Sequence, residues 1–251
     1  MKKIAVLNQK GGVGKTTTVI SLAAYMAKSG QRVLIVDSDP QGNATSGVGV
    51  DKRQCSTTLY DVLIKPEVAI EQALVETYMP NVLLVPAQET LAAAEVDLVQ
   101  ALEREKQLRY KLEGFDCDVA LIDCPPSLGL LTINALAAAD YIIIPVQAEY
   151  YALEGLGQLL DIVQRVRSGI NPGLELLGVA VTMYDKRTML SDQVHKELQS
   201  HFGDKLFQTM VPRNVRLAEA PSYGRSIIEH DKWSKGARAY KQLTKEVLER
   251  L

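Results

Sequence analysis

Short apolar runs alternate along the chain with longer segments of helical periodicity. The runs lack polar alternation, which is typical of strands buried on both faces; they are 4–7, 32–36, 82–85, 119–122, 141–146 and 176–182. Between and after them lie candidate helices at 16–28, 90–111, 129–139, 153–167, 190–201 and 235–251. This order predicts an α/β fold with a mostly parallel twisted sheet flanked by helices on both faces.

Length and composition favour one large domain over residues 1–251. The 251 residues are 47% hydrophobic and carry a net charge of −2, so the chain as a whole does not attract a polyanion. Residues 186–251 nevertheless hold 13 basic and 8 acidic residues, a net charge of +5, against −7 for the rest. An anionic partner is therefore expected at the C-terminal quarter, unless these basic residues only solvate helices.

The cysteines and the apolar segments bear on the compartment. Cys55, Cys117 and Cys124 are odd in number and lack CxxC spacing, which argues against a disulfide framework or a metal cluster held within one chain. The first apolar run is too short for a signal peptide, and no stretch reaches the roughly 18 apolar residues of a membrane span. A soluble protein in a reducing cytoplasm is expected.

A glycine-rich loop follows the first run, and its residues suit a nucleotide phosphate. Three glycines let the backbone turn its amides onto a phosphate, Lys15 can bridge the β- and γ-phosphates, and Thr16 can offer its hydroxyl to Mg²⁺. We expect nucleotide contacts from Lys10, Gly11, Gly12, Val13, Gly14, Lys15, Thr16 and Thr17. Gln9 stands where the general phosphate-loop pattern has glycine.

Carboxylates follow the second and fourth apolar runs. Asp37 and Asp39 belong to the segment Asp-Ser-Asp-Pro-Gln-Gly-Asn, and Asp123 ends the run 119–122. The carboxyl ends of parallel strands form the binding edge of such sheets, so these side chains should lie beside the phosphate loop. Asp123 is then placed to hold Mg²⁺ directly or through water. Taken alone, each aspartate could also cap an ordinary turn.

The segment Lys10-Gly-Gly-Val-Gly-Lys15-Thr16 resembles the deviant Walker A motif of the ParA/MinD family of ATPases. The resemblance extends over essentially the whole chain and is closest to the short chromosome-partitioning members of the Soj type. It implies a slow ATPase that forms a homodimer on ATP and binds double-stranded DNA without sequence preference. A ParB-type partner would stimulate hydrolysis, and the protein would associate with the nucleoid rather than with a membrane.

The resemblance also assigns roles to single residues. Lys10 would reach the nucleotide of the partner subunit, Asp39 would orient the attacking water, and Asp37 would assist the metal shell. The loops 181–185 and 211–214 resemble those around the base, and Pro212 and Asn214 are expected to contact adenine or its ribose. An asparagine amide offers both a donor and acceptors, although an ordinary turn would also explain the pair.

The resemblance places two arginines on a DNA-binding surface. Arg187 and Arg216 lie in the basic C-terminal quarter, and contacts to phosphate would carry no sequence information. The alternative is that they pair with nearby acids such as Asp185 and Glu219.

Three other functions compete with DNA partitioning. A MinD-like protein would bind membrane through a C-terminal amphipathic helix; the last segment has apolar residues at helical spacing, but acidic residues interrupt its positive charge. A redox protein like the nitrogenase reductase would need two well-placed cysteines in each subunit, and Cys117 and Cys124 instead flank one strand. A metabolic kinase would need an acceptor pocket, for which the sequence shows no evident signature.

Overall fold

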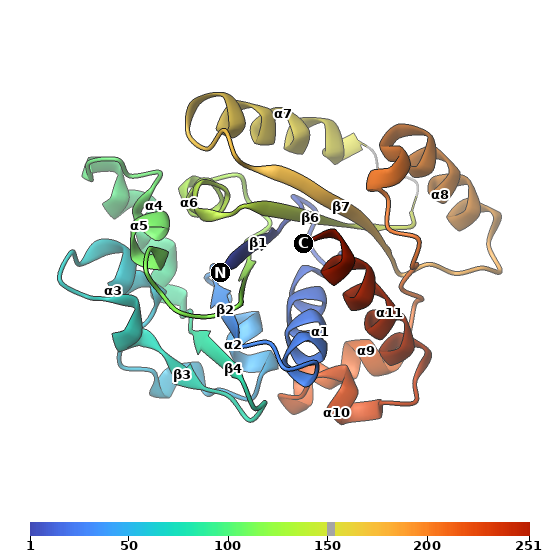
Figure 1. Ribbon diagram of the computed structural model, residues 1–251, viewed down its shortest axis with the longest axis horizontal. Helices are drawn as coiled ribbons and strands as arrows, with labels where there is room; N and C mark the ends of the chain where they lie inside the picture. The colour runs from blue at the N-terminus through green and yellow to red at the C-terminus, as the bar shows by residue number, and fades with distance from the viewer. Residues whose placement is uncertain (150–153) are drawn as a thin grey trace.

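The computed structural model describes residues 1–149 and 154–251, and its strands form one seven-stranded sheet (Figure 1). The strand order is β3-β4-β2-β5-β1-β6-β7, and every neighbouring pair is parallel except β3 with β4. The strands are β1 (Lys2–Val6), β2 (Val33–Asp37), β3 (Val75–Glu76), β4 (Val82–Val85), β5 (Val119–Asp123), β6 (Tyr141–Gln147) and β7 (Glu175–Thr182). The predicted α/β fold class is confirmed.

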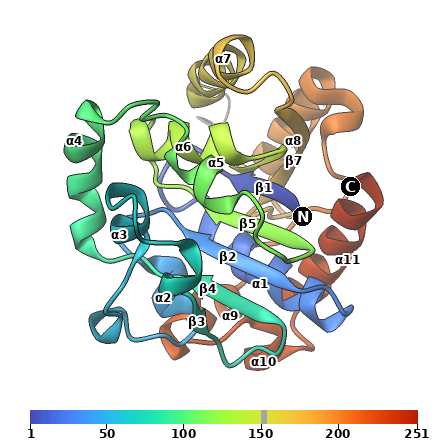
Figure 2. The same cartoon turned by 60° about the vertical axis from the view of Figure 1, so that its left-hand side comes forward.

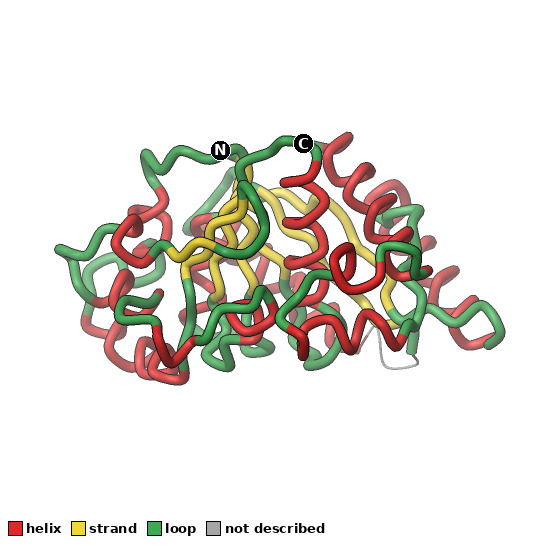
Figure 3. The backbone as a smooth tube through the Cα atoms, turned by 90° about the horizontal axis from the view of Figure 1, so that it is seen from below, coloured by secondary structure: helices red, strands yellow, loops and turns green. Residues whose placement is uncertain are grey.

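Helices cover both faces of the sheet, and Figure 3 shows the strands lying between them. The helices are α1 (Lys15–Lys28), α2 (Asn43–Gly47), α3 (Leu59–Ile64), α4 (Ala94–Asp97), α5 (Gln107–Leu112), α6 (Leu130–Ala138), α7 (Glu154–Gly169), α8 (Met189–Phe202), α9 (Val215–Glu219), α10 (Ile227–Asp231) and α11 (Lys235–Arg250). The expected helix start at Leu153 lies outside the described residues. Among the described helices, none has both the length and the apolar character needed to cross a bilayer.

The core has two halves because successive strand residues point to opposite faces of the sheet. On β2, Leu34 and Val36 pack into the half covered by α3, α5, α6, α7 and α8. Val33 and Ile35 pack into the other half, under α1, α10 and α11. Both sets are buried, which explains the continuous apolar runs in the sequence. Figure 2 shows β5, β2 and β4 running side by side in this sheet.

The single helix expected at 90–111 is wrong. The segment consists of a 3₁₀ turn at Glu89–Ala93, α4, a second 3₁₀ turn at Leu98–Gln100, an irregular stretch and α5. The buried residues Leu98 and Leu108 are ten positions apart, and on a continuous helix they would point about 80° apart. The break, in which Glu103 takes a positive φ of 48°, lets both reach the core.

Several short elements lie where the sequence gives no periodic signal. The two-residue strand β3 forms an antiparallel edge on β4, and α2, α3, α9 and α10 have only five or six residues each. α2 falls within the polar segment 41–58, the longest in the chain without a clear pattern.

Both termini lie at the end of the sheet where β1 begins (Figure 3). The loops that follow the parallel strands therefore occupy the opposite end of the sheet.

Candidate nucleotide and magnesium site

The loop between β1 and α1 is open on the side where a phosphate would approach. Gly12 and Gly14 have positive φ angles of 73° and 93°, which residues with a Cβ rarely adopt. A Cβ at Gly11 or Gly12 would meet no protein atom within 4 Å. Gly14 directly precedes α1, so the unpaired amides of the first helical turn open onto this space. The geometry suits an anion at a helix N-terminus.

The side chain of Lys15 is buried within this loop. Only 7% of Lys15 is exposed, and its Nζ donates to the carbonyl oxygen of Lys10 at 3.3 Å. Burial lowers the pKa of Lys15, and the negative charge of Asp123 opposes that shift. Its ammonium group therefore lacks the water that an exposed lysine has, and a phosphate group would restore the missing interactions.

Asp123 and Thr16 form the part of the site that suits a divalent cation. The Thr16 hydroxyl donates to Asp123 Oδ2 at 2.6 Å, while Asp123 Oδ1 is buried without a hydrogen-bond partner among the described residues. Burial raises the pKa of Asp123 well above its usual range, and the charge of Asp37 raises it further. An orphaned carboxylate oxygen beside a hydroxyl is the hard donor set that Mg²⁺ prefers, so these residues fit the metal.

Asp37 lies opposite Asp123 across the pairing of β2 with β5, but its oxygens are already in use. Its Oδ2 accepts from the backbone amide and the hydroxyl of Thr45, both at 2.7 Å, and its Oδ1 accepts from the amide of Asp39 at 3.2 Å. Burial raises the pKa of Asp37 to about 6. The structure therefore places Asp37 beside Asp123, and its hydrogen bonds to Thr45 anchor α2.

Two adjoining pockets meet at Gly14, Thr17, Met183 and Ala218. The larger, of about 600 Å³, is lined by the phosphate loop, Asp39, α2 and the α9 region. Asp39 Oδ1 accepts from the amide of Gln41 at 2.9 Å, which fixes this carboxylate at the pocket wall. The larger pocket thus brings together Asp39, the carboxylate expected to orient water, and six of the eight expected nucleotide contacts, Gly11, Gly12, Gly14, Lys15, Thr16 and Thr17. Val13 is buried and does not line it.

The smaller pocket has a volume of about 320 Å³, and half of its lining residues belong to the two late loops. Pro212 and Asn214 both line it, and the loops are joined by a hydrogen bond from the Tyr184 amide to the Val211 carbonyl at 3.0 Å. Asn214 Oδ1 is shielded from solvent and has no partner among the described residues. An unpaired acceptor at the wall of a pocket next to the phosphate loop suits an exocyclic amino group of a base.

Lys10 lies outside both pockets. Its side chain is 42% exposed, and its Nζ lies 3.4 Å from Glu149 Oε2. Glu149 also pairs with Arg213 at 3.1 Å. The two lysines of the motif therefore have different positions, because Lys15 faces the nucleotide space of its own chain and Lys10 turns to Glu149.

Arg187 and Arg216 line one groove of about 880 Å³, together with Lys186, Arg213 and Lys235. Each also pairs with the acid named above as the alternative partner: Arg187 with Asp185 at 2.7 Å, and Arg216 with Glu219 at 3.0 Å. The side chains of both arginines are more than half exposed. The structure thus brings the two arginines to one surface, and their role in binding DNA stays a prediction.

Two residues of the site were missed in the sequence. Thr45 fixes Asp37, and only its place in the long polar segment 41–58 hinted at a functional position. Met183, with a positive φ of 51°, lines both pockets; it lies in the loop 181–185 that was expected near the base, but nothing in the sequence singled it out within that loop.

Comparison with known proteins gives consistent matches along the chain. A family model described as an AAA domain matches residues 1–176. The chromosome-partitioning ATPase Soj of Thermus thermophilus is 51% identical over 251 residues, covering 100% of this chain and 97% of that protein. The sporulation initiation inhibitor protein Soj of Bacillus subtilis is 51% identical over 248 residues, covering 98% of each.

One solved structure of similar fold contains bound ligands. Cobyrinic acid a,c-diamide synthase from Mycobacterium smegmatis, solved with a bound ATP analogue and magnesium, has a TM-score of 0.84 and 39% identity to this chain, covering 98% of this chain and 93% of its own. The fold agrees with these matches, and the chain is an ATPase that uses ATP and Mg²⁺. It belongs to the ParA/Soj family of chromosome-partitioning P-loop ATPases.

Proposed function

We propose that the chain, acting as one ATPase unit over residues 1–251, is an ATP-driven switch that partitions DNA. ATP joins two copies, the homodimer binds double-stranded DNA without sequence preference, and a ParB-type partner stimulates hydrolysis and so releases it. The protein then acts at the nucleoid. The observation that supports dimerisation is the position of Lys10, which lies outside the two candidate nucleotide pockets of its own chain.

Within one subunit, the chain's own groups divide the work of hydrolysis. Lys15 neutralises charge on the phosphates, and Thr16 and Asp123 would hold Mg²⁺, Asp123 through its free Oδ1. The metal supplies positive charge to the transferring phosphoryl group. Asp39 accepts a hydrogen bond from the attacking water, and Asp37 assists the metal shell while it keeps α2 in place. Pro212 and Asn214 hold the base.

Across the dimer, Lys10 acts on the nucleotide of the partner subunit. Its pair with Glu149 joins two half-exposed side chains, and such surface pairs are weak, so the pair can break when the partner's phosphate arrives. Lys10 then stabilises charge on the phosphoryl group in the way an arginine finger does. Hydrolysis removes that charge and with it the contact that joins the subunits.

DNA binding uses the groove that holds Arg187 and Arg216. When DNA binds, each arginine gives up its exposed ion pair with an acid and contacts a DNA phosphate. Breaking the pair costs little free energy, because exposed ion pairs contribute little to stability. Two face-to-face subunits double the number of contacts, so weak binding by one copy becomes useful binding by two. This accounts for ATP-dependent DNA binding by a chain with a net charge of −2.

The test is a double variant, Arg187→Ala with Arg216→Ala, measured for DNA binding in the presence of ATP over a salt series. We expect loss of ATP-dependent DNA binding, with ATP affinity and dimerisation unchanged. The matched control is Arg165→Ala with Arg167→Ala on α7, two basic residues outside that groove. Unchanged DNA binding by the test variant would refute the proposed surface, and binding to anionic vesicles in place of DNA would favour a MinD-like function.

A further inference from the structure

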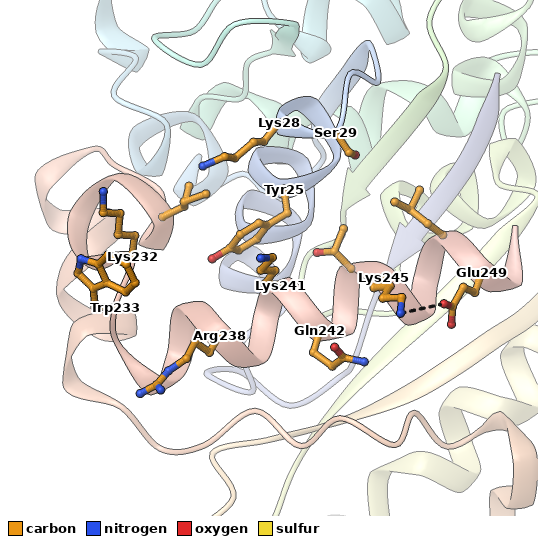
Figure 4. A pocket seen from close by; sticks show the side chains of 13 residues that line it. Tyr25, Lys28, Ser29, Lys232, Trp233, Arg238, Lys241, Gln242, Lys245 and Glu249 are labelled. Atoms are coloured by element: carbon orange, nitrogen blue, oxygen red, sulfur yellow. Dashed lines mark ion pairs between the residues drawn. The ribbon is translucent and has the colours of Figure 1, made fainter.

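A second cationic groove lies between the C-terminal part of α1 and the outer side of α11 (Figure 4). We call it the α1–α11 groove. Its volume is about 870 Å³, and its lining comprises Tyr25, Lys28, Ser29, Ile228, Lys232, Trp233, Arg238, Lys241, Gln242, Thr244, Lys245, Leu248 and Glu249. It shares none of these residues with the two nucleotide pockets or with the arginine groove.

The charge of the α1–α11 groove is strongly one-sided. Five of its lining residues are basic and one is acidic. The single acid, Glu249, pairs with Lys245 at 3.6 Å, whereas the other four cations form no ion pair within residues 1–149 and 154–251. Those four are Lys28, Lys232, Arg238 and Lys241. Free cations on both walls of a groove attract an anionic occupant.

The groove also offers apolar surface, which a purely electrostatic site would not need. The side chains of Tyr25, Ile228 and Leu248 line it and are only partly buried. Trp233 stands at one end and is 77% exposed, with the Lys232 ammonium group 5.3 Å from its ring centre. Exposed tryptophan is typical of binding surfaces, because it buries a large area and keeps a polar N–H.

The cations are spaced so that a second helix could lie along α11 and contact all of them. Arg238, Lys241 and Lys245 have the spacing i, i+3 and i+7, which puts them on one face of α11. From Arg238 to Glu249 the face is about 16 Å long, the length of about three helical turns. Lys28 faces this row from α1.

We propose that the α1–α11 groove binds an acidic amphipathic helix of a partner protein. Apolar residues of that helix would pack on Tyr25, Leu248 and Trp233, and its carboxylates would pair with the lysines of the rim. Duplex DNA would fit the groove less well, because its phosphate backbone has no apolar group to pack on Tyr25, Ile228 and Leu248. The α10–α11 turn separates the two surfaces, since Asp231 and Ser234 line the arginine groove and Lys232 and Trp233 line this one.

The experiment uses the full chain without nucleotide and a labelled model peptide of three to four turns. The peptide carries leucines on one face and glutamates on the other. Binding is followed by fluorescence anisotropy, and also by the emission of Trp233, the only tryptophan in the chain. We expect saturable binding with a change in Trp233 emission. The combined variant Arg238→Glu and Lys241→Glu should weaken binding at least about tenfold.

The controls decide between the occupants. Arg165→Glu, on α7, reverses a surface charge outside the groove and should leave peptide affinity unchanged. A peptide with lysines in place of the glutamates should not bind. No saturable binding of the acidic peptide, or binding that the groove variant leaves unchanged, would overturn the proposal. The proposal would also be overturned if the wild-type protein did not bind the peptide and the groove variant lost binding to DNA or to vesicles. The occupant of the groove would then be a nucleic acid or a lipid surface.

Discussion

Replacing Asn214 by alanine should change stability and ATP affinity in opposite directions. Asn214 Oδ1 is shielded from water and has no hydrogen-bond partner among the described residues. An unsatisfied buried acceptor costs about 1–3 kcal/mol. Asn214 is also the residue before α9, yet its side chain makes no capping hydrogen bond, so alanine does not lose one there. We expect Asn214→Ala to raise the free energy of unfolding by about 1 kcal/mol.

ATP binding should weaken in the same variant. The exocyclic amino group of adenine can donate to Asn214 Oδ1, and one such hydrogen bond contributes about 0.5–1.5 kcal/mol. This corresponds to a loss of about twofold to tenfold in ATP affinity. Guanine carries an oxygen acceptor at the equivalent position, so the affinity for GTP should stay the same or rise. The variant should therefore lose discrimination between the two nucleotides.

Two measurements check this prediction. Thermal unfolding without nucleotide should show a midpoint higher by about 2–4 °C, the shift that 1 kcal/mol gives in a chain of this size. Competition of ATP and GTP against a fluorescent nucleotide should show a smaller ratio of affinities. An equal loss of both affinities, or an unchanged ratio with lower stability, would show that Asn214 supports the loop instead of contacting the base.

Three further variants test the remaining roles. Lys15→Ala should lose nucleotide affinity, since the buried ammonium is the charge held inside the loop; retention of wild-type ATP affinity in equilibrium dialysis would contradict this. Asp39→Ala should keep ATP bound and accumulate as a dimer in light scattering; a variant that hydrolyses ATP at the normal rate would move the water-orienting role elsewhere. Glu149→Gln should free Lys10 and strengthen ATP-dependent dimerisation about twofold to fivefold, whereas weaker dimerisation would show that Glu149 helps to place Lys10.

The sheet and the phosphate site could be predicted because their signals are local. A strand buried on both faces needs an uninterrupted apolar run, and the turn after β1 needs glycine where φ is positive, as at Gly12 and Gly14. The position of Asp123 at the end of such a run then places a carboxylate at the edge where the loop lies. Sequence alone therefore brought Lys15, Thr16 and Asp123 to one site, as the structure shows.

The parts that could not be predicted depend on contacts that no local pattern in the sequence specifies. The hydrogen bond from Thr45 to Asp37 and the pair of Lys10 with Glu149 join segments that local patterns do not connect. The break after Leu98 has the same origin, because the core that receives Leu98 and Leu108 is built from other elements. A single helix satisfied the local periodicity of 90–111, and the tertiary packing overrode it.

The C-terminal helix contacts the candidate nucleotide site as well as forming part of the outer surface. The Thr18 hydroxyl donates to the Gly14 carbonyl at 2.7 Å and lies 3.0 Å from the Tyr240 hydroxyl, so α11 is tied to the residue that ends the phosphate loop. Tyr240 is buried and lines the smaller pocket, the one proposed to hold the base, while the next residue, Lys241, lines the α1–α11 groove. Close-packed interiors transmit strain. Strain in α11 from a helix bound on its outer side would therefore reach the smaller pocket through Tyr240.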